Sequence, residues 1–373
     1  MLLLIPGPVM TRPAVREAAA HDAAPWDSDF RPIYAGVRDR LLRIAGGVAD
    51  EHTCLPLQGS GHFVIEAAIR SFVPPGGRIL VPGTGRYADS MIRLAKEAGR
   101  VPVPLPISPL APTDPDIVAR ALASDPTLGH VGLVQSETGS GVVHSVQDVG
   151  AVVRTAGRRM IVDAVSAFGA LPLELAAQPE IDAAVFTPNK CLEALPGIAF
   201  AVARIDRLEA CAGNAGSWSL DLADIHAMAP GRPRFTPPVQ IVNALNTALD
   251  FFDAEGGRLA RLARYTENAR VFHDGMMALG LVPYLTRENQ GPIIVVTHAP
   301  PDPRWDLQAF VDALKRRGVL ISNFFNTPVP TFRVGCIGAI TPDDMKRAVN
   351  MIAESLNELG IEQRKAARDE PGS

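Results

Sequence analysis

The stretch "IDAAVFTPNKCLEALPGIAFAVAR", residues 181–204, holds two apolar runs that flank a short segment with one lysine, Lys190. Both runs are rich in Ala, Val, Ile and Phe, which is typical of buried strands. A cation between two buried strands costs free energy unless it is paired or chemically modified. Desolvation lowers the pKa of a lysine, and its neutral amine then attacks carbonyl groups. Lys190 is therefore a candidate nucleophile.

Strands and helices alternate from about residue 53 to residue 205. Apolar runs at 53–58, 78–82, 101–106, 130–137, 159–165, 182–188 and 198–204 are separated by helical patterns at 61–72, 87–99, 116–125 and 145–157. This alternation predicts an α/β fold with a mostly parallel sheet that is covered by helices on both faces.

The pattern changes after residue 240, where two helical stretches lead into a smaller α+β unit. Its last helix is expected to follow Thr341 as N-cap, with Pro342 at the first position and two acids next. We predict an N-terminal segment, 1–20, that joins this smaller unit. The large α/β domain is expected at 21–255, the small C-terminal α+β domain at 256–363 and a disordered tail at 364–373.

Composition excludes several classes of protein. The 373-residue chain has a net charge of −4, which argues against non-specific binding to nucleic acid or anionic membranes. It has no apolar run of about 18 residues, so no transmembrane helix is expected. The opening "MLLLIPGP" lacks the basic region and the length of a signal peptide, so a cytoplasmic protein is predicted.

Cysteines and histidines give no sign of a metal site. The spacing typical of metal ligands is absent among the eight histidines. It is also absent among the four cysteines, Cys54, Cys191, Cys211 and Cys336. We expect no metal and no structural disulfide.

Three polar segments fall at predicted strand ends, where ligands bind in open α/β sheets. The Gly-Ser-Gly turn at 59–61 opens a helix and could bind an anion, or could be a plain strand-to-helix turn. Asp163 ends a buried strand and could face a protein donor, a metal or a protonated cofactor nitrogen, or could cap the next loop. "SET", 136–138, precedes a glycine-rich turn and by itself indicates only that turn.

Taken together with Lys190, these segments predict one cofactor. Pyridoxal 5'-phosphate (PLP) requires a lysine for its aldehyde, an anion site for its phosphate and a carboxylate for its pyridinium nitrogen. Asp163 and Lys190 follow successive predicted strands and are accompanied by the Gly-Ser-Gly turn. PLP is therefore the predicted cofactor.

Motifs spread over most of the chain carry a resemblance to a known family. They are "LLLIPGPV" (2–9), "PWDSDF" (25–30), "LQGSGHFVIEA" (57–67), "SETGSG" (136–141), "IVDAVSAFGALPLEL" (161–175), "NKCLEALPGIAF" (189–200), "SWSLDL" (217–222), "RFTPP" (234–238) and "FRVGCIGAI" (332–340). With them the chain resembles the class V aminotransferases of PLP fold type I. The Asn-Lys-Cys and Ser-Leu-Asp-Leu runs favour the members that convert 2-aminoethylphosphonate and pyruvate into phosphonoacetaldehyde and L-alanine.

The resemblance implies a role for each matching residue. Lys190 would form the Schiff base and move the proton, and Asp163 would pair with the pyridinium. The phosphate would be held by Ser60, Gly61 and His62, and by Thr236 from a partner subunit. Tyr87 would stack on the cofactor ring, Thr138 would lie beside it, and Arg333 would bind the anionic group of the substrate. A homodimer with shared active sites is implied as well.

Other functions remain open at this point. A serine or alanine aminotransferase that uses glyoxylate or pyruvate would keep the same chemistry with another donor. A PLP lyase or desulfurase is a further alternative, but a desulfurase requires an exposed cysteine of lowered pKa. Cys191 and Cys336 lie instead in segments that are expected to be packed. A PLP-binding regulator would need a basic DNA-binding module, which the sequence lacks.

Overall fold

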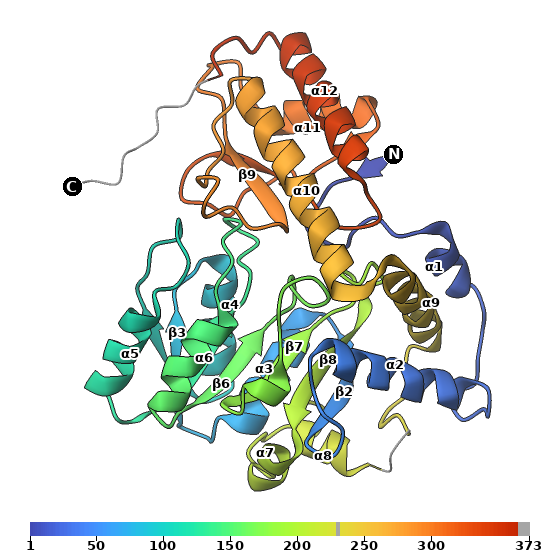
Figure 1. The fold of residues 1–373 in the computed structure, drawn as a ribbon, viewed down its shortest axis with the longest axis vertical. Helices are drawn as coiled ribbons and strands as arrows, with labels where there is room; N and C mark the ends of the chain where they lie inside the picture. Colours follow the sequence, from blue (N-terminus) through green and yellow to red (C-terminus); the bar gives the residue numbers. More distant parts are fainter. Residues whose placement is uncertain (229–231, 365–373) are drawn as a thin grey trace.

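The computed structural model describes residues 1–228 and 232–364, and its main feature is a seven-stranded sheet (Figure 1). The strand order is β2-β8-β7-β6-β5-β3-β4. Strands β3 to β7 run parallel to one another, whereas β8 is antiparallel to both β2 and β7. The strands are β2 (His52–Gly59), β3 (Arg78–Pro82), β4 (Val101–Leu105), β5 (Leu128–Val134), β6 (Arg159–Asp163), β7 (Ile181–Phe186) and β8 (Gly197–Arg204).

Helices cover both faces of this sheet. One face packs against α2 (Phe30–Ile44), α5 (Pro115–Ser124), α6 (Val146–Thr155) and α9 (Val239–Glu255). The other face packs against α3 (Gly61–Phe72), α4 (Arg86–Glu97), α7 (Ile205–Ala210) and α8 (Leu222–Ala227). Successive strand residues point to opposite faces, so Leu80 joins the first core and Ile79 and Val81 join the second. A sheet that is apolar on both faces is the reason for the near-continuous apolar runs.

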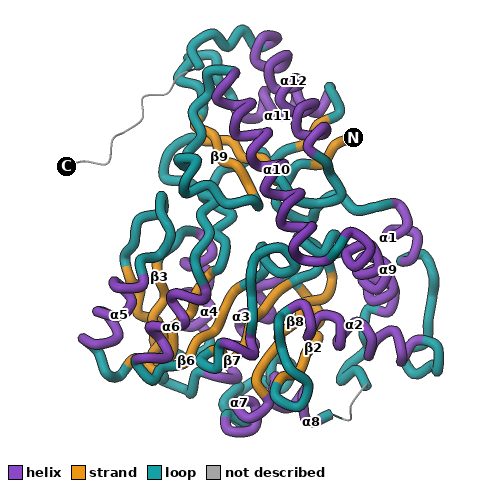
Figure 2. The backbone as a smooth tube through the Cα atoms, in the orientation of Figure 1, coloured by secondary structure: helices purple, strands orange, loops and turns teal. Residues whose placement is uncertain are grey.

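A second unit lies beside the sheet and contains the C-terminal part of the chain (Figure 1). Strands β9 (Ile294–His298) and β11 (Thr331–Gly335) pair antiparallel, and β1 (Leu2–Leu3) pairs in parallel with β10 (Val319–Leu320). Its helices are α10 (Gly257–Ala278), α11 (Leu307–Arg316) and α12 (Pro342–Glu358), which share one apolar core with these strands. The long α10 runs from the end of α9 into this unit, and loops fill the space between the unit and the sheet (Figure 2).

The predicted fold class is confirmed, since the sheet is mixed but mostly parallel and is covered by helices. Thr341 caps α12 in a capping box with Asp344, as the Thr-Pro-Asp-Asp run indicates. The stretch 319–325 contributes only the two residues of β10.

The domain boundaries at residues 20, 255 and 363 remain a prediction. The segment 1–20 contributes β1, which pairs with β10, and α1 (Pro13–Ala18), which contacts α9. A single 3-10 turn, Leu175–Ala177, precedes β7. Of the expected tail, residues 365–373 lie outside the described residues.

The described part of the chain lacks two features, a membrane-spanning helix and a cluster of metal ligands. Over residues 1–228 and 232–364, no helix has both the length and the apolarity needed to cross a membrane. The same residues contain no group of three or more His, Cys, Asp or Glu side chains placed to hold a metal ion. All four cysteines are free and buried.

Candidate active site

Three of the predicted site residues lie at one edge of the sheet. Asp163 is the last residue of β6, Lys190 lies in the loop after β7, and Thr138 lies in the turn after β5. These strands are parallel neighbours, so their carboxyl ends meet at the same edge. The fold thereby places side chains from separate parts of the chain in one region.

Burial changes the protonation of the two central residues in opposite directions. Desolvation, with a smaller contribution from the positive charge of Arg333, lowers the pKa of Lys190 to about 8, although Cys191 and Asp163 oppose the shift. Desolvation raises the pKa of Asp163 to about 6, although the Val165 N–H, which donates to Asp163 Oδ1 at 2.9 Å, and the Lys190 ammonium both favour the carboxylate. Lys190 can therefore lose its proton near neutral pH while Asp163 remains ionised.

Gly7 lies against the side chain of Lys190, a contact that the sequence analysis missed. Its φ of +149° is strained for residues other than glycine. A Cβ atom at this position would lie 2.5 Å from Lys190 Cε and 3.0 Å from Nζ. The N-terminal "PGP" segment therefore packs against the side chain of Lys190. Only glycine at position 7 leaves room for that side chain.

We expect Gly7→Ala to reduce turnover by at least about tenfold, because the new methyl group must displace the Lys190 amine from its position. The substitution should also change the pKa of Lys190, which can be followed through the pH dependence of cofactor attachment. Gly36→Ala is the control, since a Cβ at Gly36 would meet no atom within 4 Å. Equal turnover in the two variants would mean that Gly7 does not confine Lys190.

The predicted anion site lies next to the turn that follows Asp163. Ser60 is the N-cap residue of α3, and within the described structure its hydroxyl makes no capping hydrogen bond. A Cβ on Gly61 would lie 2.9 Å from Val165 Cγ2, so the start of α3 packs directly on that turn. His62 follows on the first turn and is exposed. The positive end of α3 is thus available to an anion near Asp163.

Arg333 reaches the same region from the second unit. It is buried in β11, and its Nη1 donates a hydrogen bond to the Thr138 carbonyl oxygen at 3.1 Å. The guanidinium carbon lies 4.5 Å from the centre of the Phe324 ring. Its Nε is buried and has no hydrogen-bond partner among the described residues. A buried guanidinium with a free donor is suited to an anionic ligand.

Glu137, to which the sequence alone assigned no role, connects Tyr87 to this region. Tyr87 lies in the first turn of α4, and its backbone N–H donates to Glu137 Oε2 at 3.2 Å. Glu137 stands beside Thr138 in the quoted "SETGSG" run. Its position in a segment at a strand end was the only sequence signal that could have identified it.

Thr236 is the one predicted residue that the structure does not bring to the others. It is exposed in the segment 232–238. Its neighbour Phe235 packs edge-to-face on Trp218 with ring centres 5.3 Å apart, and the Arg234 guanidinium lies over both rings. A role of Thr236 at the site would require a second subunit.

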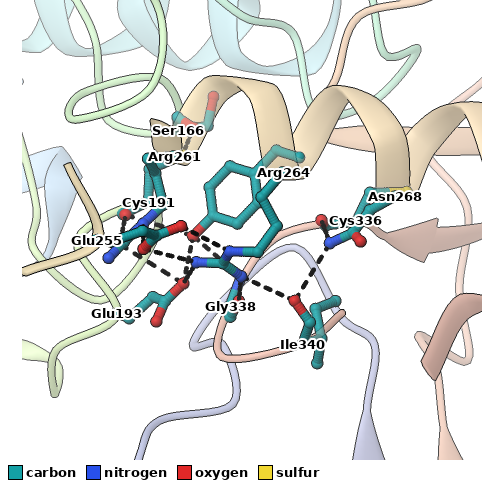
Figure 3. A network of polar contacts seen from close by, with 11 residues as sticks. Ser166, Cys191, Glu193, Glu255, Arg261, Arg264, Asn268, Cys336, Gly338 and Ile340 are labelled. Atoms are coloured by element: carbon teal, nitrogen blue, oxygen red, sulfur yellow. Dashed lines mark hydrogen bonds and ion pairs between the residues drawn. The ribbon is translucent and has the colours of Figure 1, made fainter. Parts of the chain in front are cut away.

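Two arginines of α10, Arg261 and Arg264, bond the segment of Cys191 and Glu193 that directly follows Lys190 in the sequence (Figure 3). The fully buried Arg261 donates from Nη1 to the Cys191 carbonyl oxygen at 2.6 Å and from Nε to Glu255 at 2.8 Å. Arg264 donates from Nη2 to Glu193 Oε1 at 2.6 Å. The backbone of the residue after Lys190 is therefore fixed by α10.

The same cluster reaches the strand that carries Arg333. Arg264 Nη1 donates to the Gly338 carbonyl oxygen at 2.7 Å, a few residues after β11. The Tyr265 hydroxyl donates to Glu193 Oε1 at 2.7 Å and accepts from the Gly338 N–H at 3.2 Å. The cluster thus connects the Lys190 turn with the end of β11 through α10.

We expect Arg261→Met to lower the free energy of unfolding by about 3 kcal/mol, because it removes the 2.6 Å hydrogen bond to the Cys191 carbonyl and leaves the carboxylates of Glu193 and Glu255 to share Arg264. Urea unfolding of the cofactor-free protein measures the change. Arg270→Met on the same helix is the control. The Arg270 side chain is 50% exposed in its ion pairs with Glu267 and Asp274, and its loss should cost less than about 0.5 kcal/mol. Equal losses would contradict the importance of the buried cluster.

Comparison with known proteins identifies the family. The sequence model of the class-V aminotransferases matches residues 27–323. The chain is 44% identical to the 2-aminoethylphosphonate–pyruvate transaminase of Burkholderia ambifaria over 370 residues, which is 99% of either chain. It is 42% identical to the protein of that name from Pseudomonas putida, with 96% of this chain and 98% of that protein covered.

Solved structures agree with this match. Pyridoxamine–pyruvate aminotransferase from Mesorhizobium loti superposes with a TM-score of 0.87 at 26% identity, covering 98% of this chain and 94% of that one. Alanine–glyoxylate aminotransferase from Nostoc sp. has the same fold, with a TM-score of 0.85 at 22% identity and coverage of 96% and 94%. With a family match over most of its length and relatives of more than 40% identity, the chain belongs to the class V aminotransferase family.

Proposed function

We propose that this protein transfers the amino group of 2-aminoethylphosphonate to pyruvate with the help of PLP, giving phosphonoacetaldehyde and L-alanine. The proposal depends mainly on one observation: Lys190, Asp163 and Arg333 lie close enough together at one edge of the sheet for their charges to act on one another. The choice of substrates is supported by the full-length similarity to transaminases named for this reaction.

The residues present fit PLP. Lys190 is a desolvated amine of lowered pKa, Asp163 is a buried carboxylate near it, and the start of α3 packs beside the turn after Asp163. These are the groups that the aldehyde, the ring nitrogen and the phosphate require. When bound, PLP would supply a protonated ring that stabilises the carbanion formed at the substrate carbon bearing nitrogen.

Each residue then has a defined task. Lys190 would hold the cofactor through Nζ, and its amine would be the base that removes the proton from the substrate carbon that bears nitrogen. Its pKa of about 8 leaves part of the amine neutral near pH 7.5, as a base requires. Asp163 keeps the ring nitrogen protonated, because its carboxylate is ionised above about pH 6. Arg333 binds the phosphonate of the donor and the carboxylate of pyruvate by charge-assisted hydrogen bonds.

The remaining residues would hold the cofactor in place. Ser60, Gly61 and His62 would bind its phosphate at the helix start, where backbone N–H groups and the helix dipole favour anions. Tyr87 would stack on its ring, and Thr138 would lie at the ring's edge.

A homodimer is part of this proposal, with Thr236 reaching the phosphate of the partner subunit. Three aromatic side chains near this segment are exposed: Trp218 by 73%, Phe63 by 51% and Phe235 by 41%. Exposed aromatic residues in such a group are typical of a protein–protein interface. Sedimentation velocity measures the mass in solution, and a monomer would exclude the shared site.

The alternative functions differ in what they require of the site. An alanine or serine aminotransferase that uses glyoxylate would need the same lysine and aspartate with another donor. A desulfurase would need a reactive thiolate, whereas burial raises the pKa of both Cys191 and Cys336 to about 12. The thiols therefore disfavour the desulfurase.

Absorption spectroscopy of the PLP-loaded protein tests the proposal. We expect the visible cofactor band to disappear when 2-aminoethylphosphonate is added without an acceptor, with one phosphonoacetaldehyde released per site. Pyruvate should then restore the band and yield alanine. A band that persists with this donor and disappears with alanine or serine would contradict the phosphonate assignment. Failure of any visible band to form would contradict the cofactor itself.

A further inference from the structure

Glu137 is a fully buried acid that the proposed reaction does not use. Its Oε1 accepts a hydrogen bond from the Gly139 N–H at 2.8 Å, and its Oε2 accepts one from the Tyr87 N–H at 3.2 Å. The backbone leaves room for this carboxylate at Gly85, whose φ is +143°. A Cβ atom there would lie 2.9 Å from Glu137 Cδ. The carboxylate is therefore closely fitted between two loops.

The hydrogen bond from the Tyr87 N–H to Glu137 Oε2 orients Tyr87. The first N–H groups of a helix have no partner within the helix, and the N-cap of α4 is Gly85, which has no side chain to serve them. Glu137 supplies the missing acceptor from a strand end 50 residues away in the sequence. A carboxylate at the positive end of α4 is also favoured by the helix dipole.

The other hydrogen bond of Glu137 orients the turn that contains Thr138. The Gly139 N–H is held by Glu137, and the carbonyl oxygen of Thr138 accepts from Arg333 Nη1 at 3.1 Å. A single carboxylate thus positions the predicted stacking residue, a predicted cofactor contact and, through Thr138, the predicted substrate arginine.

The pKa of Glu137 is set by its burial and by the charged and polar groups around it. Burial raises its pKa to about 7, the two backbone N–H groups oppose this, and the negative charges of Asp163 on β6 and Asp89 on α4 add to it. Burial lowers the pKa of Arg333 on β11, and the charge of Glu137 is among the groups that oppose this, so the positive guanidinium faces Glu137.

We propose that Glu137 is a positioning residue for transamination: its ionised carboxylate fixes Tyr87 and Thr138, and protonation releases one of them. Protonation removes the charge and turns one carboxylate oxygen into a hydroxyl, which is a much weaker acceptor, so one of the two N–H groups loses most of its hydrogen bond. The inference rests on the proposed function of the site. If Glu137 acts in this way, the activity of the site depends on pH through Glu137 in addition to Lys190 and Asp163.

The pH profile of kcat/KM in Glu137→Gln tests the assignment. Glutamine resembles the protonated acid, because it places a donor where one carboxylate oxygen was. The wild type should lose kcat/KM as the pH falls through about 7. The variant should be roughly 10- to 100-fold less active at pH 8 and should lack this step. A variant with the wild-type profile would overturn the proposal.

Two further variants separate charge from packing. Glu137→Asp keeps a titrating carboxylate that is too short to reach both N–H groups, so it should be slower and keep the acid step. Glu180→Gln is the matched control at a buried acid near the start of β7, where the wild-type profile is expected. An Asp variant without the step would overturn the proposal.

Hydrogen exchange of the wild-type, PLP-loaded protein gives a readout that needs neither turnover nor a variant. Between pH 8 and pH 6, after correction for intrinsic exchange, protection of the Tyr87 or Gly139 amide should fall at least fivefold. The Asp89 amide, which donates to the Gly85 carbonyl at 3.0 Å within the same helix start, should not change. Constant protection of both amides would overturn the proposal. An inactive wild type with this exchange pattern would instead refute the proposed function alone.

Discussion

Lys190→Ala should lower steady-state transamination by at least about 10³-fold, because one substitution removes both the cofactor attachment and the proton-transferring group. Among residues 1–228 and 232–364 no other lysine can replace it at this edge, since Lys96, Lys315 and Lys346 are exposed on α4, α11 and α12. Borohydride reduction and peptide mass spectrometry of the wild type should place the cofactor on Lys190.

The loss of activity should occur without loss of stability. A lysine whose pKa is lowered on folding carries a cost in stability, which is fully present below about pH 8 and disappears only as the pH rises above the unfolded pKa. Removal of the amine should therefore leave the thermal midpoint at pH 7 unchanged or higher. Lys315→Ala is the control for an exposed lysine and should retain full activity. Steady-state turnover by Lys190→Ala would show that the site has been assigned wrongly.

Asp163→Asn should be the second most damaging substitution, with a loss of roughly 10²- to 10³-fold in kcat/KM. The amide has the same shape as the carboxylate but carries no charge to keep a ring nitrogen protonated. Burial raises the pKa of Asp163 to about 6, so its ionised form disfavours folding at pH values above this. Asparagine should therefore not lower the thermal midpoint at pH 8.

A second buried aspartate on the next strand provides the matched control. Asp182 on β7 is fully buried and is paired with Arg159 at 2.6 Å, with Arg207 at 2.9 Å and with His130 at 3.3 Å. These partners hold its pKa below the usual value although burial opposes them. Its ionised form therefore stabilises the fold above the unfolded pKa, and this contribution is lost as the pH falls.

The two asparagine variants should separate activity from stability. Asp182→Asn should lose stability at pH 7 and, where folded, keep its kcat, whereas Asp163→Asn should lose kcat/KM and keep its stability. The measurements are initial rates and thermal midpoints on the same preparations. If Asp163→Asn kept more than a tenth of the wild-type kcat/KM, the aspartate would not serve the cofactor nitrogen.

Much of the site could be predicted because the fold type follows from local patterns. The alternation of apolar runs and helical spacing predicted parallel strands, and parallel strands bring their carboxyl ends together. Lys190 and Asp163 could therefore be linked without knowledge of any long-range contact. Arg333 and Thr236 depended on resemblance, since nothing in their local sequence indicates a position near a ligand.

The sequence by itself determined the fold class, the helix cap at Thr341 and the residues at the strand ends, because each depends on neighbours within a few positions. Tertiary structure alone decided that Gly7 confines Lys190, that Glu137 caps α4 and that Arg261 holds the Lys190 turn. These contacts join residues that lie about 50 to 180 positions apart, and no periodic pattern encodes such pairs. The raised pKa values of Asp163 and Glu137 also followed only from packing, because desolvation depends on what surrounds a group in the fold.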